Sequence, residues 1–395
     1  FKFSENILSF NEYEILISIL IYVSTISIFF IYAKFLKAKI KHIFIIFIYH
    51  SLFCITFYFY TFFFVNDADT YYFIAKNDTK CSYFLDTFSY RNIIYFINFF
   101  EEIGLNYFNI FLVFNLIGSV GILFIFLSLR HLNFNKSKLI NIFTYIFVLF
   151  PSYNFWSSGL GKDSIVFTLI SLIIYTLILN KKNYIIISSL LISIIFLFRP
   201  YIALILFFSL TCHFLIDVRF TKKVKIILFS ILLFVIYINK KIILSLIDYK
   251  YDISIQNTLK YINQKRSVGS FQKYEQISFN FNTYIFDFIS YLFKPFNFSI
   301  SNKFIFFNSL ENLVLLILSI IILSKIRFTK IINIFKAKYT FFFIYFITTL
   351  ATLSITITNL GIISRHKIMI LGVYFIILLL IYNSQLNKIK SKAIK

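Results

Sequence analysis

Long apolar runs, separated by short polar segments, dominate this chain from one end to the other. A helix that crosses the hydrocarbon core of a bilayer needs about 20 mostly apolar residues, and runs of that kind recur along the sequence. They begin near residues 15, 43, 106, 139, 163, 184, 201, 226, 311, 340 and 368. The pattern predicts an all-α fold, a polytopic transmembrane helical bundle of about 11 spans that forms a single membrane domain over residues 1–395.

Prolines mark two interruptions in these runs. Pro151 ends or bends the fourth run, because a proline inside a helix removes a backbone hydrogen bond. Arg199 and Pro200 divide the apolar stretch that the runs near 184 and 201 share, and we expect a helical hairpin that turns there. The first run lacks both a basic leader and a small-residue cleavage site, so we interpret it as a membrane span and not as a signal peptide.

Basic residues are concentrated in alternate connections between the runs. These segments hold 22 of the 39 Lys and Arg residues but one acid, Asp217. They are residues 34–41, 130–138, 181–182, 217–225, 325–338 and 388–395. Because short cytoplasmic loops accumulate positive charge, the segments predict an N-terminus outside and a C-terminus inside the cell.

Two long segments then fall on the outside, a first external loop at residues 66–105 and a second at residues 240–310. Within the second, Tyr284–Phe298 is aromatic and amphipathic. A helix that lies in the membrane interface would suit this pattern. A short re-entrant segment is the alternative.

Composition agrees with a protein whose solvent is lipid. Hydrophobic residues make up 59% of the chain and charged residues 14%, and the mean hydropathy is +0.84, which excludes a soluble fold. The net charge of +23 comes from residues that punctuate apolar runs, so we expect the lipid bilayer and no nucleic acid as a partner. Cys54, Cys81 and Cys212 are not placed for a disulfide or a zinc site, and we predict neither a metal nor a cofactor.

The first candidate site follows the second span, where Asp67 and Asp69 precede Tyr71. A carboxylate at the membrane surface can be partly desolvated, which raises its pKa toward that of a general base, or it can bind a sugar hydroxyl. Alternatively, the aspartates only end a helix and solvate a loop.

The second candidate site is the stretch FPSYNFWSSGLGKDSIVF, which contains Trp156, the one tryptophan of the chain. Two glycines precede Lys162 and Asp163, so the backbone can approach a ligand there, and amides at a helix start favour an anion. Lys162 adds a point charge. The competing interpretation makes Trp156 an interfacial anchor and Asp163 an ordinary first-turn residue of a helix.

Two arginines complete the candidates. Arg199 falls between two apolar runs, where a charge is costly unless it is paired or bound to an anion. Arg365 enters the last span together with His366 and Lys367, and it is placed to bind a phosphate. Snorkelling of Arg199 to headgroups and anchoring of the last span in the interface are the alternatives.

In this order of features the chain resembles bacterial proteins of surface-polysaccharide assembly, the O-antigen and exopolysaccharide polymerases and the GT-C type membrane glycosyltransferases. The resemblance is carried by the many spans, by Asp67 and Asp69 in an early external loop, and by the external residues Lys162, Arg199 and Arg365. The acidic loop follows the second span, a layout that suits the polymerases better.

The resemblance implies an enzyme of the bacterial inner (plasma) membrane that transfers or polymerises sugar from a polyprenyl-phosphate-linked glycan at the external face, beside other glycan-assembly membrane proteins. One of Asp67 and Asp69 would activate an acceptor hydroxyl, and the three basic residues would stabilise a pyrophosphate leaving group. Asp163, Trp156 and Tyr71 would contribute to substrate binding. A transporter or flippase of a lipid-linked saccharide or another anion is the alternative, and a membrane scaffold without catalysis is a third.

Overall fold

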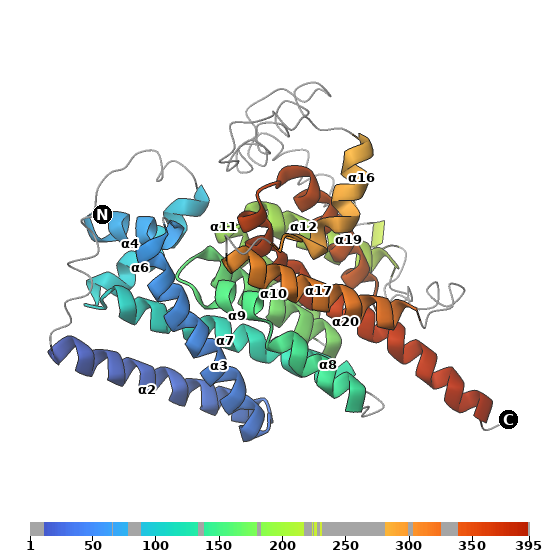
Figure 1. The fold of residues 1–395 in the computed structure, drawn as a ribbon, viewed down its shortest axis with the longest axis horizontal. Helices are drawn as coiled ribbons and strands as arrows, with labels where there is room; N and C mark the ends of the chain where they lie inside the picture. The colour runs from blue at the N-terminus through green and yellow to red at the C-terminus, as the bar shows by residue number, and fades with distance from the viewer. Residues whose placement is uncertain are drawn as a thin grey trace. The chain divides into compact units, whose positions relative to one another are not determined.

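The described part of the chain is helical throughout. The computed structural model describes residues 12–64, 66–77, 88–132, 138–179, 183–216, 281–298, 303–324 and 339–393, with four single positions between 223 and 230. No strand occurs in these residues (Figure 1). Cys81, most of the predicted span that begins near 226 and most of the segment 240–310 lie outside them.

Six of the described helices are long and apolar enough to cross a membrane. They are α2 (Glu12–Phe35), α3 (Ile40–Phe63), α7 (Tyr107–Leu132), α10 (Lys162–Leu179), Ile305–Leu323 of α17 (Lys303–Leu323) and Leu360–Tyr382 of α20 (Leu360–Ala393). Their length and composition indicate an all-α integral membrane protein. The helices α8 (Lys138–Val148), α11 (Tyr184–Phe198), α12 (Pro200–Ile216) and α19 (Thr340–Thr356) are apolar but have 11 to 17 residues, so the number of spans stays a prediction.

Helices begin close to the predicted starts except in two cases. The helices α17 and α20 each begin eight residues before the predicted start of their span, at Lys303 and Leu360. In α20 the cause is a capping residue, because Asn359 Oδ1 accepts hydrogen bonds from the amides of Gly361 (2.9 Å) and Ile362 (3.2 Å). The polar residues between Leu360 and the predicted start at 368 therefore belong to α20.

Contacts divide the chain into two compact units, and each is described by itself. Unit 1 comprises Phe1–His131 and Ser137–Arg199, and unit 2 comprises Leu132–Lys136 and Pro200–Lys395.

The directions of the helices in unit 1 follow from their side-chain contacts. Helix α3 is antiparallel to α7, since His50 contacts Asn115 on α7 while Cys54, further along α3, contacts the carbonyl of Phe111. Helix α3 is parallel to α8 and α9 (Pro151–Ser158), because Tyr49 donates to the carbonyl of Leu149 and Phe57 packs on Phe155.

Helix α10 runs parallel to α7, because Thr168 donates to the carbonyl of Ile117 and, one to two turns further on, Tyr175 packs on Phe124. Helix α11 is antiparallel to α10, with Ser188 3.4 Å from Thr176. One end of unit 1, hereafter the polar end, therefore gathers the ends of α3, α9 and α11 and the starts of α7 and α10.

A buried polar network joins α3, α7 and α9 within unit 1. His50 Nδ1 donates to Asn115 Oδ1 (2.7 Å), and His50 Nε2 lies 3.0 Å from Ser157 Oγ. Gly118 faces this network so closely that a Cβ atom there would overlap the carbonyl oxygen of Ser157. The network therefore fixes the end of α9, where the second candidate site begins.

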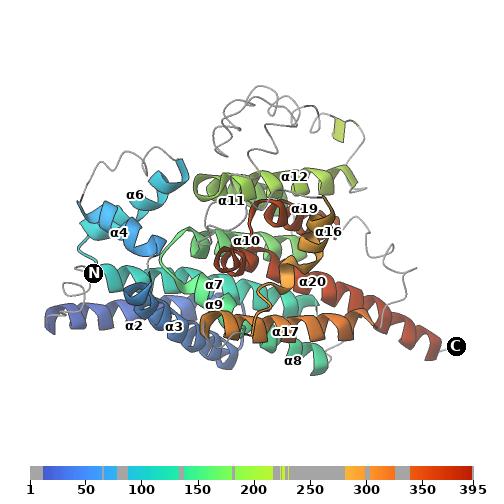
Figure 2. The ribbon, with the colours of Figure 1, turned by 45° about the horizontal axis from the view of Figure 1, so that its top comes forward.

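The predicted first external loop contains two short helices, α4 (Asp67–Asn77) and α6 (Phe88–Glu102). They pack on each other, and α6 also packs on α11, where Asn92 donates to the carbonyl of Leu197 (2.8 Å). Figure 2 shows both at the same end of the long helices. Ile93, Ile94 and Ile97 form the buried face of α6.

Unit 2 is built from α12, α16 (Phe281–Ser290), α17, α19 and α20, with the 3-10 turn η1 (Tyr291–Phe293). Helix α19 packs on α12, α16 and α20, and α17 packs on α20. Lys367 of α20 contacts Asn312 of α17, and Tyr374 contacts Ser319 (2.7 Å) seven residues further along both helices. The helices α17 and α20 are therefore parallel.

Candidate functional site

The turn between α9 and α10 is shaped by packing. Pro151 occupies the first turn of α9, where its missing amide costs nothing. A Cβ atom on Gly159 would collide with the ring of Phe57, whereas one on Gly161 would lie an ordinary 3.9 Å from Tyr71. Gly159 is thus required by an aromatic neighbour within the fold, and the chain then enters α10 at Lys162.

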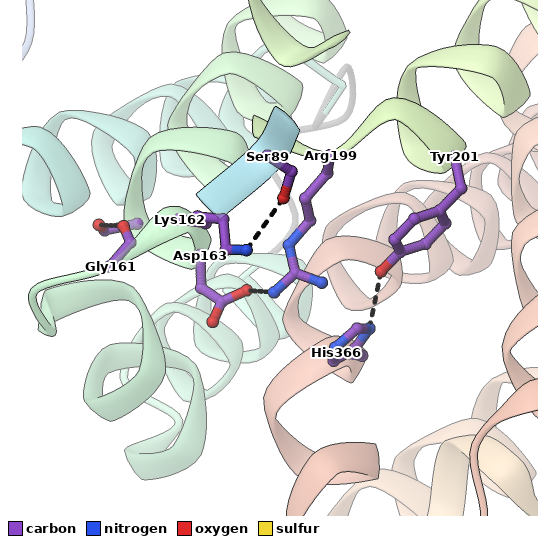
Figure 3. A network of polar contacts seen from close by, with 8 residues as sticks. Ser89, Gly161, Lys162, Asp163, Arg199, Tyr201 and His366 are labelled. Atoms are coloured by element: carbon purple, nitrogen blue, oxygen red, sulfur yellow. Dashed lines mark hydrogen bonds and ion pairs between the residues drawn. The ribbon is translucent and has the colours of Figure 1, made fainter. Parts of the chain in front are cut away.

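Lys162 is buried, and its side chain points to Ser89 of α6 (Figure 3). Its Nζ donates to Ser89 Oγ (2.9 Å) and lies 3.5 Å from the centre of the Tyr90 ring and 5.7 Å from that of Tyr71. The negative faces of aromatic rings attract an ammonium group. The side chains of α4 and α6 therefore surround a cation at the start of α10.

Arg199 and Asp163 form an ion pair beside Lys162 (Figure 3). Arg199 directly follows α11, and Asp163 lies in the first turn of α10. Both side chains are buried, and charges within a membrane protein are paired in this way. Asp163 neutralises one of two cations, so Lys162, Asp163 and Arg199 together carry a net charge of +1. We call these three residues with Tyr71, Ser89 and Tyr90 the polar cluster.

Asp69 is held by two donors on the side of α4 that faces α7. Tyr107 donates its hydroxyl proton to Oδ1 (2.5 Å), and Asn66 donates its amide to Oδ2 (2.9 Å). Asn66 also caps α4, because its Oδ1 accepts from the amides of Ala68 and Asp69. Burial raises the pKa of Asp69, while the hydrogen bonds from Tyr107, Asn66 and Thr61 lower it and offset part of that rise.

The structure brings four of the predicted residues into one cluster and leaves others outside it. Tyr71, Lys162, Asp163 and Arg199 lie together, whereas Asp69 points to α7, because residues two apart on a helix do not face the same side. Asp67, the first residue of α4, is partly exposed.

Two further predicted residues, Trp156 and Arg365, have different surroundings. Trp156 is half-buried against the rings of Phe57 and Phe155, an arrangement that also suits an interfacial anchor. Arg365 belongs to unit 2. The ring of its neighbour His366 lies with Nδ1 3.0 Å from the hydroxyl oxygen of Tyr201 (Figure 3).

Sequence reasoning missed Ser89, Tyr90, Asn66 and Tyr107. The first two could have been found from the helical spacing of Ile93, Ile94 and Ile97, which predicts a helix with a buried face just after them. Asn66 stands directly before two acidic residues, which is typical of a helix start. The sequence carries no signal for the contact between Tyr107 and Asp69, which are 38 residues apart.

Buried cations at one end of a bundle can bind an anion, and a positioned carboxylate can accept a proton. Within the described residues, no group of three or more His, Cys, Asp or Glu side chains is arranged to hold a metal ion. Fold and cluster together define an all-α integral membrane protein with a polar cluster at one end of unit 1. Neither a family model, nor a curated protein, nor a solved structure matches this chain.

Proposed function

We propose that this protein is a membrane glycosyltransferase or polysaccharide polymerase that uses a polyprenyl-phosphate-linked donor at the external face of the bacterial plasma membrane. The observation that carries the proposal is the position of Lys162, a buried cation, at the same end of unit 1 as the carboxylate of Asp69. A phosphate group and an acceptor hydroxyl are the partners that suit a cation and a base.

The proposed topology has about 11 spans, with the N-terminus outside and the C-terminus inside. The helix directions support it, because α2, α7 and α10 all end at the side of unit 1 opposite the polar end, and each is followed by a basic segment. Short basic segments face the cytoplasm. The polar end then faces outward, where lipid-linked glycans would be extended.

In the proposed reaction, Asp69 accepts the proton of the acceptor hydroxyl while Lys162 and Arg199 stabilise the negative charge that develops on the leaving pyrophosphate. Asp69 suits the role of base better than Asp67, because two hydrogen bonds fix its carboxylate and burial raises its pKa. Arg365, which belongs to unit 2, stays a predicted phosphate ligand from its position at the start of α20 alone. Trp156 is proposed to offer an aromatic face to a sugar ring, whereas the fully buried Tyr71 would act by positioning Lys162.

The test uses the full chain in vesicles supplied with lipid-linked glycan extracted from the host cells. Asp69→Asn should lower the rate of glycan transfer by about 100-fold or more, the usual contribution of a general base. Asp67→Asn is the matched control, two residues away on the same helix, and should retain most of the activity. Full activity in the double variant would overturn the proposal.

Transport of a lipid-linked saccharide or another anion is the second candidate function. One observation favours it, since Lys367 is buried within the apolar part of α20, and ionisable residues inside membrane spans often mark a substrate pathway. The same vesicles distinguish the two candidates. Movement of the lipid-linked glycan between leaflets, without any change in its length, would favour transport.

A further inference from the structure

Residues 294–298, which follow η1, have non-helical backbone that side chains of two membrane helices hold by hydrogen bonds. Lys367 Nζ donates to the carbonyl oxygen of Lys294 (3.2 Å), and Asn312 Nδ2 donates to that of Pro295 (2.8 Å). Ser309 Oγ donates to the carbonyl of Asn297 (2.8 Å) and accepts from its amide (2.9 Å). Three side chains of α17 and α20 thus bind the backbone of residues 294–297.

These contacts lie well inside the apolar length of both helices. Asn312 and Lys367 are each seven residues from the start of the apolar segments Ile305–Leu323 and Leu360–Tyr382. A rise of 1.5 Å per residue places them about 10 Å from the ends of those segments. The hydrocarbon core is about 30 Å thick, so residues 294 and 295 would lie roughly a third of the way into it where those segments span the core from end to end.

The side chains of Lys367 and Asn312 and the backbone of residues 294 and 295 satisfy each other's hydrogen bonds where water is excluded. Lys367 and Asn312 are both 1% exposed, and Glu311 of α17 adds a buried carboxylate in electrostatic range of Lys367. Non-helical backbone at membrane depth is tolerated only where protein groups satisfy its amides and carbonyls. The ammonium and the amide supply those hydrogen bonds, and the carbonyl oxygens in turn stabilise the buried ammonium.

We infer that Phe281–Phe298 is a re-entrant element, in which α16 and η1 enter the membrane and residues 294–298 return, with Lys367 as the latch that holds its innermost part. The exposed side chains of Ile285, Phe286 and Ile289 on α16 suit contact with lipid. An ion pair between Lys294 and Asp287 (2.6 Å) ties the returning chain to α16. A helix lying flat in the interface would not reach the middle of the α17 and α20 contact.

Depth measurements distinguish the re-entrant element from an interfacial helix. Single cysteines replace Ile285, Ile289 or Phe296 in the full chain after Cys54→Ala, Cys81→Ser and Cys212→Ala, and each receives a nitroxide label in phosphatidylcholine vesicles. Collision rates with oxygen and with a water-soluble nickel complex then report depth. A depth that increases from 285 to 296 is expected. Equal depth at all three positions would overturn the inference.

The latch is tested by reaction of Phe296→Cys with a membrane-impermeant maleimide. Lys367→Met should speed labelling by about tenfold, since a hydrogen bond from a charged donor is lost, and Lys367→Arg should restore slow labelling. Asn312→Leu provides a second variant should Lys367→Met fail to fold. Tyr374→Phe, which removes the next contact between α17 and α20, is the control. Wild-type labelling rates in both Lys367→Met and Asn312→Leu would exclude the latch.

Discussion

Among single residues, the charges of the polar cluster differ in how the fold accommodates them. Asp163 and Arg199 neutralise each other, whereas Lys162 is surrounded by a hydroxyl and two aromatic rings. The ion pair is therefore expected to matter chiefly for folding. Lys162 donates a hydrogen bond to Ser89 and lies over the Tyr90 ring, and a buried ammonium group of this kind suits an anionic ligand.

Loss of one partner of the buried pair should destabilise the protein strongly. Arg199→Met leaves the carboxylate of Asp163 buried beside a neutral side chain, at a cost of about 3–5 kcal/mol. The double variant Arg199→Met and Asp163→Leu should recover most of that loss. Thermal unfolding of the purified protein in detergent measures both. The control is Asn98→Ala, which removes an exposed hydrogen bond to Glu102 on α6 and should cost about 1 kcal/mol or less.

The hydroxyl of Tyr107 tunes the acidity of Asp69. Burial raises the pKa of this carboxyl, and the hydrogen bond from Tyr107 lowers it. Tyr107→Phe removes the lowering contribution, so the pKa of Asp69 should rise further and its titration should move to higher pH. Carbodiimides react with protonated carboxyl groups, and mass spectrometry of the modified Asp69 at a series of pH values follows the change.

The exposed Tyr95 on α6 provides the control for this titration. Tyr95→Phe should leave the pH dependence of Asp69 modification unchanged. An unchanged pH dependence of Asp69 modification in Tyr107→Phe would contradict the prediction. If Asp69 is the base, the acidic limb of the transfer reaction should move to higher pH in Tyr107→Phe as well, because the base must be ionised to act.

At the scale of helices, the packing of Phe57 determines how α9 ends. Gly159→Ala should destabilise unit 1 by about 1–3 kcal/mol, because the added methyl group meets the Phe57 ring. Gly161→Ala is the matched control two residues away, where the added Cβ makes only an ordinary contact with Tyr71. Thermal unfolding compares the two. Equal effects would mean that the Phe57 contact does not set the requirement for glycine.

Most helices could be predicted from the apolar runs, because membrane helices must satisfy their backbone internally and need a fixed apolar length. Pro151 correctly indicated the break between α8 and α9. The helices α4 and α6 were missed because they are too short and too polar to register as spans. Only their apolar spacing indicates them.

The candidate site could be predicted in part. Lys162, Asp163 and Arg199 were found from the cost of placing charge beside apolar runs, and the structure brings them together. The partners Ser89 and Tyr90 could not be inferred, since their contact with Lys162 spans about 70 residues of chain and depends on how α6 packs. Lys367 was interpreted as a possible interface anchor, but it is buried, because α20 begins earlier than its apolar run.

For the whole molecule, the central prediction is its orientation in the membrane. An odd number of spans would place the two termini on opposite sides, and the basic segments predict a C-terminus in the cytoplasm. The parallel course of α17 and α20 agrees with this alternation, because the intervening α19 lies between them in sequence.

Reporter fusions measure this orientation directly. Green fluorescent protein fused after Lys395 should fluoresce, since it folds in the cytoplasm, whereas alkaline phosphatase fused after Asn77 of α4 should be active, since it requires export. Exchanging the two reporters should abolish both signals and serves as the control. A fluorescent fusion after Asn77 would place the polar cluster on the cytoplasmic side, where a donor exposed outside the cell cannot reach it. That outcome would remove the basis for external glycan transfer while leaving the fold of unit 1 unchanged.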